Sequence, residues 1–284
     1  MKAELIIQID GVDLGEGPVW DHTLNVLRWV DITSGMLYSY NPESHENIGY
    51  KFDQMLGAAI PTNKGNLILA LQNGLAFFNE KLEELNYIID PESNKPQNRF
   101  NDAKCDPNGR LWAGTMNINP PHKPEGSLYM LDNDLELTKK LTNIGISNGL
   151  GWNKNGNKFF YIDTVLSKIR SFDYDIVNGN LHNEKDLVKF DNESPDGMAV
   201  DANDNLWVAF YMGSKVVCFD SITGEVLNRV DVPAMCVTSC AFGGKDLETL
   251  YITSAYKEGD LLSGGLFAVS PGVKGRRSDF FKEI

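Results

Sequence analysis

Four carboxylate or carboxamide side chains recur at equivalent places in this chain, each four residues before an apolar residue that ends a short strand pattern: Glu16, Asn101, Asn148 and Asp196. Glu16, Asn148 and Asp196 together offer carboxylate and amide oxygens, two negative charges, and no imidazole or thiolate. This set suits the hard cations Ca²⁺, Mg²⁺ and Mn²⁺, with Zn²⁺ or Fe²⁺ tolerated. The sequence therefore predicts one divalent metal ion (Ca, Mg, Mn or Zn) bound by these three residues, with coordination positions left open for water and substrate.

Each candidate ligand also has a simpler structural interpretation. A lone Glu in a loop is usually solvated, and Asn148-Gly149 and Asp196-Gly197 are ordinary turn sequences. In both places, however, a second turn sequence follows the predicted strand, so the first one has no hairpin to make. If the two carboxylates and two carboxamides lie together in a buried place, they also need a cation or polar ligand to satisfy them. Metal binding is therefore the favoured interpretation.

Arg99 and Asn101 are two residues apart on one predicted strand, so both side chains can point to the same side. Their donors suit hydroxyl groups and a carbonyl oxygen, which makes them candidate substrate-binding residues. The alternative for Arg99 is an ion pair with a surface acid.

The four cysteines, Cys105, Cys218, Cys236 and Cys240, lack the paired spacing of a zinc site and are expected to be reduced and buried. Neither a Cys nucleophile with a base nor a serine-hydrolase elbow is recognisable.

A repeated strand–turn–strand pattern must position these residues. Six copies end their first strand at equivalent residues: Trp20, Ile60, Cys105, Trp152, Val200 and Phe242. The spacing of about 40 to 48 residues is the period of a four-stranded propeller blade. We predict an all-β, six-bladed β-propeller with a central metal site, formed by residues 1–284 as one domain. The residues four positions before these six then form a ring around the central channel: Glu16, Leu56, Asn101, Asn148, Asp196 and Thr238.

Residues 2–10 resemble a strand that completes the sixth blade beside residues 279–282 and so removes a free sheet edge. Proline-rich or glycine-rich loops at 90–98, 117–126 and 257–265 are expected to shape a pocket mouth. Four tryptophans are expected in the blade cores: Trp29, Trp112, Trp152 and Trp207.

The net charge of −13 argues against nucleic acid and anionic membranes as partners, because those surfaces require an excess of Lys and Arg. With 42% hydrophobic residues the chain can bury a sizeable core. No apolar run is long enough for a transmembrane helix, and residues 1–10 are too short and too acidic for a signal peptide. We therefore expect a cytoplasmic protein with a small-molecule partner.

Five motifs occur in the order found in the regucalcin/gluconolactonase family, and nearly the whole chain resembles it; they lie at residues 14–20, 99–116, 146–150, 194–198 and 238–244. That family comprises six-bladed propellers that are metal-dependent sugar lactonases, together with members described as calcium-binding or luciferin-regenerating. The resemblance implies that Glu16, Asn148 and Asp196 bind metal and that Arg99 and Asn101 contact substrate.

One position departs from the family pattern. Animal members have a substrate-binding Glu four residues before a Gly-x-Leu-Tyr segment, whereas this chain has His122 there. The nearby acid, Glu125, directly precedes Gly126 and is the candidate replacement.

The function expected from this resemblance is hydrolysis of a sugar aldonolactone to its aldonic acid. The metal would polarise the lactone carbonyl while Asp196, or a water that it holds, delivers hydroxide. Two alternatives stay open: a non-enzymatic calcium-binding protein, and an ester or organophosphate hydrolase that uses the same ring.

Overall fold

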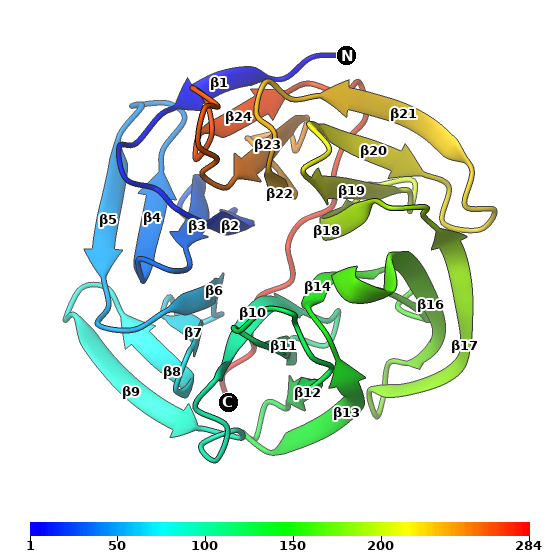
Figure 1. The fold of residues 1–284 in the computed structure, drawn as a ribbon. Helices are drawn as coiled ribbons and strands as arrows, with labels where there is room; N and C mark the ends of the chain where they lie inside the picture. Colours follow the sequence, from blue (N-terminus) through cyan, green and yellow to red (C-terminus); the bar gives the residue numbers. More distant parts are fainter.

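The computed structural model describes residues 1–284, which form six four-stranded antiparallel sheets arranged radially around a central channel (Figure 1). The innermost strands are β2 (Gly15–Asp21), β6 (Leu56–Pro61), β10 (Asn98–Cys105), β14 (Ser147–Trp152), β18 (Ser194–Val200) and β22 (Val237–Gly243). The second strands are β3 (Val26–Asp31), β7 (Leu67–Leu71), β11 (Leu111–Asn117), β15 (Lys158–Asp163), β19 (Leu206–Tyr211) and β23 (Thr249–Ser254). This arrangement confirms the predicted six-bladed propeller.

The outer half of each blade has the same order. The third strands are β4 (Met36–Tyr40), β8 (Gly74–Asn79), β12 (Gly126–Leu131), β16 (Lys168–Asp175), β20 (Lys215–Phe219) and β24 (Leu266–Val269). The outermost strands are β5 (Asn47–Lys51), β9 (Glu84–Ile89), β13 (Leu137–Ile144), β17 (Asn180–Lys189), β21 (Val226–Asp231) and β1 (Glu4–Ile7). The inner strands are buried almost throughout, whereas outermost strands such as β17 are largely exposed. This radial change in burial explains why the repeat is visible in the sequence.

The N-terminal strand closes the ring, as predicted, because β1 pairs with β24 at the outer edge of the sixth blade. The prediction that this strand lies beside residues 279–282 is wrong. The C-terminal segment instead crosses the channel, and Phe281 forms an isolated bridge with Thr62 beyond β6 (Figure 1). The Phe281 side chain is fully buried in the apolar cluster shared by blades two and three. Burial of this large ring explains why the segment bypasses blade six.

The blade cores contain the predicted tryptophans, and Trp29, Trp112, Trp152 and Trp207 are all buried. All four cysteines are unpaired and buried, as predicted. Burial raises the pKa of Cys240 to about 12, which does not suit a nucleophilic thiolate. The one helical element is the 3-10 turn η1 (Thr164–Leu166), and no helix has the length and apolarity needed to cross a membrane.

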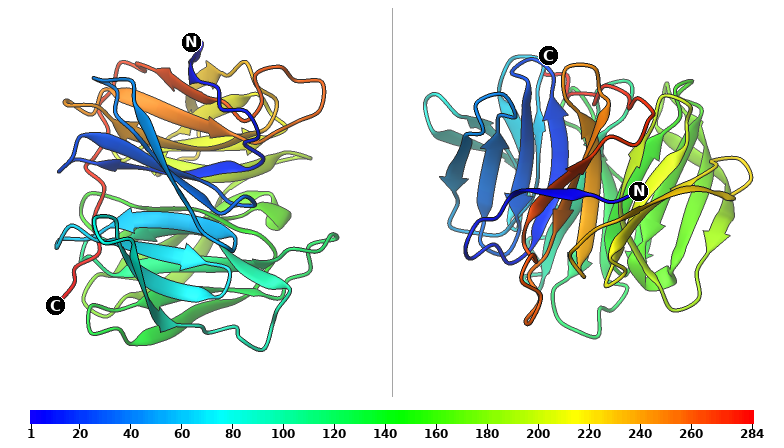
Figure 2. Two further views of the ribbon diagram at one scale, coloured as in Figure 1. Left: turned by 90° about the vertical axis from the view of Figure 1, so that its left-hand side faces the viewer. Right: turned by 90° about the horizontal axis from the view of Figure 1, so that it is seen from above.

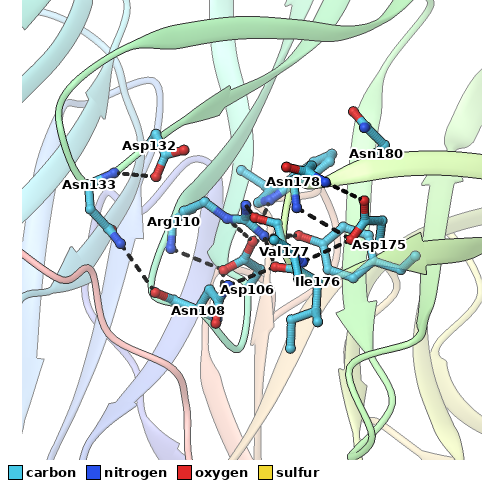
Figure 3. A network of polar contacts seen from close by, with 12 residues as sticks. Asp106, Asn108, Arg110, Asp132, Asn133, Asp175, Ile176, Val177, Asn178 and Asn180 are labelled. Atoms are coloured by element: carbon cyan, nitrogen blue, oxygen red, sulfur yellow. Dashed lines mark hydrogen bonds and ion pairs between the residues drawn. The ribbon is translucent and has the colours of Figure 1, made fainter.

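A buried arginine connects blades three and four (Figure 3). Arg110 Nε donates to Asp106 Oδ2 at 2.7 Å, and Asp106 caps the turn that follows β10. The two Nη groups of Arg110 reach across to the turn between β16 and β17, where they donate to the carbonyl oxygens of Val177 at 3.0 Å and Ile176 at 2.8 Å. Because these bonds cross between sheets, they fix the position of β10 relative to blade four.

The propeller has two different faces (Figure 2). The loops at 117–126 and 257–265 project from one face, and the C-terminal segment runs across the other. Each inner strand begins at the loop face and ends at the C-terminal face. Residues in the first half of the inner strands therefore lie near the loop face of the channel.

Candidate functional site

The six predicted ring residues lie at one kind of position, an irregularity in the pairing of each inner strand. The register with the second strand shifts after Glu16, between Leu56 and Ala58, after Phe100, after Asn148, after Pro195 and between Val237 and Ser239. Such bulges re-aim side chains and increase local twist. They explain how residues inside regular sheets can direct polar groups toward the channel.

The carboxyl groups of Glu16 and Asp196 lie next to each other, and both are more than nine-tenths buried. Burial, reinforced by the neighbouring Asp102, raises the pKa of Glu16 to about 8. Burial and the charge of Glu16 likewise raise the pKa of Asp196 well above its ordinary value. Glu16 Oε2 also accepts a hydrogen bond from the Gly17 amide at 2.6 Å. A pair of buried carboxyls of this kind is stabilised by a cation.

A chain of hydrogen bonds links blades three, four and five beside these acids. Arg99 Nη1 donates to Asn101 Oδ1 at 2.5 Å, and Asn101 Nδ2 donates to Asn148 Oδ1 at 2.9 Å. Asn148 Nδ2 then donates to Thr164 Oγ1 at 2.8 Å. The Thr164 hydroxyl donates to the carbonyl oxygen of Pro195 at 2.7 Å, directly before Asp196. These bonds determine which way the Asn148 amide points.

Thr164 was not identified from the sequence. It lies in η1, after the second strand of its blade, and no repeated pattern marks it. The preceding residue, Asp163, caps this turn by accepting from the Val165 amide at 3.2 Å. A short capped turn therefore places the hydroxyl next to the ring.

Asp102 is a third buried acid beside the ring. Only 4% of its surface is exposed, and its Oδ2 atom has no hydrogen-bond partner. Burial raises the pKa of Asp102, while the positive charge of Lys104 opposes this effect. Sequence reasoning placed Asp102 in a motif without giving it a role, because the chain pattern does not show that its side chain is enclosed.

Arg99 is buried and makes no ion pair with a surface acid, so the alternative interpretation of this residue is wrong. Burial lowers the pKa of Arg99 to about 10, and the charges of Glu16 and Asp196 oppose the shift. Its Nη1 group is used by Asn101 and by the Phe100 carbonyl oxygen. The donors on Nε and Nη2 have no partner within the chain.

The residues at this site fit a hard divalent cation. Three buried carboxyl groups lie beside one buried guanidinium, and one carboxylate oxygen is unpartnered. No group of three or more His, Cys, Asp or Glu side chains is arranged as a metal cluster. A metal held here would therefore need the amide oxygen of Asn148 in addition to the carboxylates of Glu16 and Asp196.

The structure places Glu125 at the edge of the site. Its Oε2 atom accepts from Asn117 Nδ2 at 2.6 Å, and its carbonyl oxygen accepts from Asn98 Nδ2 at 3.2 Å. His122 Nδ1 lies 2.9 Å from the Asn117 carbonyl oxygen in the same loop. Glu125 thus neighbours the strand that carries Arg99, but its carboxylate contacts Asn117 rather than a ring residue.

Leu56 and Thr238 complete the ring without adding a charge. Leu56 is fully buried in an apolar cluster, and Thr238 Oγ1 donates to the Gly15 carbonyl oxygen at 2.5 Å. This bond ties blade six to the strand that carries Glu16. Both residues therefore have packing roles, and the polar part of the ring comes from blades one, three, four and five.

A family model, related sequences and solved structures were compared with this chain, and the three comparisons agree with one another. Residues 14–256 match the family model described as the SMP-30/Gluconolactonase/LRE-like region. The Bacillus subtilis protein named "Putative sugar lactone lactonase YvrE" is 40% identical over 86% of this chain and 84% of its own length. Regucalcin from Gallus gallus is 36% identical over 94% of each chain. The solved structure of a luciferin-regenerating enzyme superposes with a TM-score of 0.94 at 31% identity, covering 99% of each chain.

The family match covers all the polar ring residues and the loops at 90–98 and 117–126. The protein belongs to the SMP-30/gluconolactonase/LRE-like family of six-bladed propellers.

Proposed function

We propose that this protein hydrolyses the ring ester of a sugar lactone to the open hydroxy acid, with a divalent metal ion at Glu16, Asn148 and Asp196. The observation that carries this proposal is the pair of buried, adjacent carboxyls of Glu16 and Asp196, set beside the unused donors of Arg99. The name of the Bacillus subtilis relative supports a lactone as the substrate.

A divalent ion bound at this ring would act as a Lewis acid toward the lactone carbonyl and would offset negative charge that develops on its oxygen. Glu16 and Asp196 would hold it through their carboxylates, and Asn148 through Oδ1. One lone pair of Asn148 Oδ1 accepts from Asn101, which leaves the other for the ion. Thr164 keeps this amide from rotating because its hydroxyl accepts from Asn148 Nδ2.

Arg99 and Asn101 would orient the lactone. The free Nε and Nη2 donors of Arg99 suit the oxygen atoms of a hydroxylated ring. Both Asn101 Nδ2 hydrogens are used, by the Ser147 carbonyl oxygen at 2.7 Å and by Asn148 Oδ1. Asn101 can therefore meet a substrate hydroxyl only through its Oδ1 acceptor, and its larger role is to hold Arg99 and Asn148 in place.

Asp196 would serve as the general base. A carboxylate at the ring is a group that can take a proton from a water molecule beside the substrate. Asp196 would take a proton from a water molecule while the water oxygen bonds to the carbonyl carbon. The bond between that carbon and the ring oxygen then breaks, and the ring oxygen leaves as a hydroxyl after receiving a proton. The product is the open hydroxy acid.

The proposal is tested by dialysing the protein against a chelator and measuring acid release from a panel of five- and six-membered sugar lactones. We expect activity to be lost and then restored by Ca²⁺, Mg²⁺, Mn²⁺ or Zn²⁺. Full activity in the metal-free protein would overturn the metal requirement. Metal binding without turnover would favour a calcium-binding protein, and turnover confined to aryl esters or phosphotriesters would favour the other hydrolase alternative.

A further inference from the structure

Exposed apolar side chains gather on one side of the loop face, at the ends of blades five and six. We call four of them the apolar rim: Tyr211, Met212, Met235 and Tyr256. Each is more than a third exposed. Tyr211 ends β19, Met212 begins the turn into β20, Met235 lies just before β22, and Tyr256 follows β23. All four positions are therefore at the same face as the polar ring.

Backbone contacts tie the apolar rim to the strands of the site. Tyr211 is the cross-strand partner of Ser194, two residues before Asp196. The amide of Tyr256 donates to the Asp13 carbonyl oxygen at 2.7 Å, just before the strand that carries Glu16. The amide of Ser214 donates to the Met235 carbonyl oxygen at 3.1 Å, which joins the two blades. The rim thus borders the channel mouth from blade five to blade one.

Tyr211 lies near the acidic residues of the site. Burial and the neighbouring Cys236 raise the pKa of Tyr211 to about 12, and the carboxylates of Asp196 and Asp13 add to the shift. Asp196 belongs to blade five and Asp13 to the start of blade one.

Met212 occupies a backbone conformation that its side chain disfavours. Its φ angle is +59°, in the left-handed region where Gly, Asn and Asp are favoured and bulky residues are rare. The thioether rests on the buried Cys236, with Sδ 3.4 Å from Sγ, while 49% of the residue is exposed. Residues in such conformations cluster at functional sites.

The opposite side of the mouth is polar. It holds Arg99, Asn117 and Glu125 on blade three and its loop. A fully hydroxylated ring would satisfy this side but would place hydroxyl groups against thioether and aromatic surfaces. A lactone with a polar ring and an apolar substituent would match both sides.

We propose that the apolar rim binds an alkyl or aryl substituent of the substrate, so that the substrate class includes lactones with an apolar side chain. This inference rests on the proposed lactonase function. The thioether of Met212 and the rings of Tyr211 and Tyr256 would cover the substituent, while the donors of Arg99 bind the lactone oxygens.

The test compares δ-valerolactone, δ-hexalactone, δ-octalactone and δ-decalactone as substrates of the metal-loaded protein, with D-glucono-δ-lactone as the polar reference. We expect kcat/KM to rise with chain length by up to about fourfold for each methylene buried. Met212→Asn should flatten this rise while raising Tm, because Asn tolerates the left-handed conformation. The control is Ile222→Asn, 87% exposed in the turn at the opposite end of blade five, which should change neither chain-length dependence nor the reference activity.

Turnover of the reference lactone with no dependence on chain length would overturn the rim inference and leave the proposed function standing. An unchanged chain-length dependence in both Met212→Asn and Tyr256→Ser would also overturn it. Dimers of the wild-type protein in analytical ultracentrifugation that dissociate in Met212→Asn would assign the rim to a second copy of the chain instead. No turnover of any lactone would overturn both proposals together.

Discussion

The side-chain amide of Asn101 donates to the Oδ1 atom of Asn148 at 2.9 Å, across the junction between blades three and four. A candidate substrate-binding residue and a candidate metal ligand are thus parts of one hydrogen-bonded unit. This unit extends from Arg99 to Thr164, so changes along it are expected to affect metal affinity and substrate affinity to different extents.

Asn148→Ala removes a neutral ligand but leaves the charges of Glu16 and Asp196, so we expect weaker metal binding and partial rescue of activity by excess metal.

Thr164→Val keeps Asn148 as a ligand but frees the Asn148 amide to rotate, and should weaken metal binding by about 10- to 100-fold. Thr164→Ser retains the hydroxyl and is the matched control. Isothermal titration with Ca²⁺ or Mn²⁺ would measure these effects. Wild-type affinity in Thr164→Val would show that its hydroxyl does not orient Asn148.

Asp196→Asn preserves the shape of the side chain but removes both a negative charge and the proposed base. We expect turnover to be lost and excess metal to leave it lost, because rebinding of the ion does not restore proton removal. Lactone hydrolysis measured at increasing metal concentration checks this. Recovery of wild-type kcat at high metal would restrict Asp196 to metal binding.

Arg99→Ala leaves all three candidate ligands in place and should act on substrate binding. A hydrogen bond from a charged donor contributes about 1.5–3 kcal/mol, which corresponds to an increase in KM of roughly 10- to 150-fold. Steady-state kinetics and metal titration on the same preparation separate an effect on KM from an effect on metal affinity. Loss of metal affinity with an unchanged KM would contradict the assignment.

The raised pKa values of Glu16, about 8, and Asp196 predict how stability changes with pH. In the metal-free protein the folded state binds more protons than the unfolded chain above the ordinary carboxyl pKa. The free energy of unfolding should therefore fall as the pH rises from about 5 to about 8. A bound divalent ion favours the ionised carboxylates, so the gain in Tm on adding metal should grow across the same range.

Differential scanning fluorimetry of chelator-treated protein, with and without Mn²⁺, measures the fall in stability with pH and the gain in Tm from metal. The double variant Glu16→Gln, Asp196→Asn should lose most of the pH dependence. A gain in Tm from metal that shrinks as the pH rises would be inconsistent with carboxylate ligands at this ring.

The C-terminal segment should stabilise the propeller through Phe281. This ring is fully buried between blades two and three, so Phe281→Ala is expected to destabilise the protein by about 3–5 kcal/mol. Ile284→Ala, at an 82% exposed position, should change the free energy of unfolding by no more than about 0.5 kcal/mol. Urea denaturation of both variants provides the comparison. Equal free energies of unfolding for Phe281→Ala and Ile284→Ala would show that Phe281 does not anchor the C-terminal segment.

The sequence by itself determined the repeat and the ring. Strand–turn–strand units are local, since turn residues and apolar alternation are read from a few neighbouring positions. The period therefore placed Glu16, Asn101, Asn148 and Asp196 at equivalent positions on inner strands without any knowledge of the fold. Closure by the N-terminal strand was also predictable, because an open blade would leave a free sheet edge.

The tertiary structure decided everything that depends on contacts between blades. The bulges that direct ring side chains into the channel, the enclosure of Asp102 and the hydroxyl of Thr164 all result from pairing between segments that local patterns do not relate. The same holds for Phe281, whose burial carried the C-terminal segment past blade six to blade two. Burial and pKa depend on the full three-dimensional surroundings of a group, so a linear pattern names the candidate residues but not their environment.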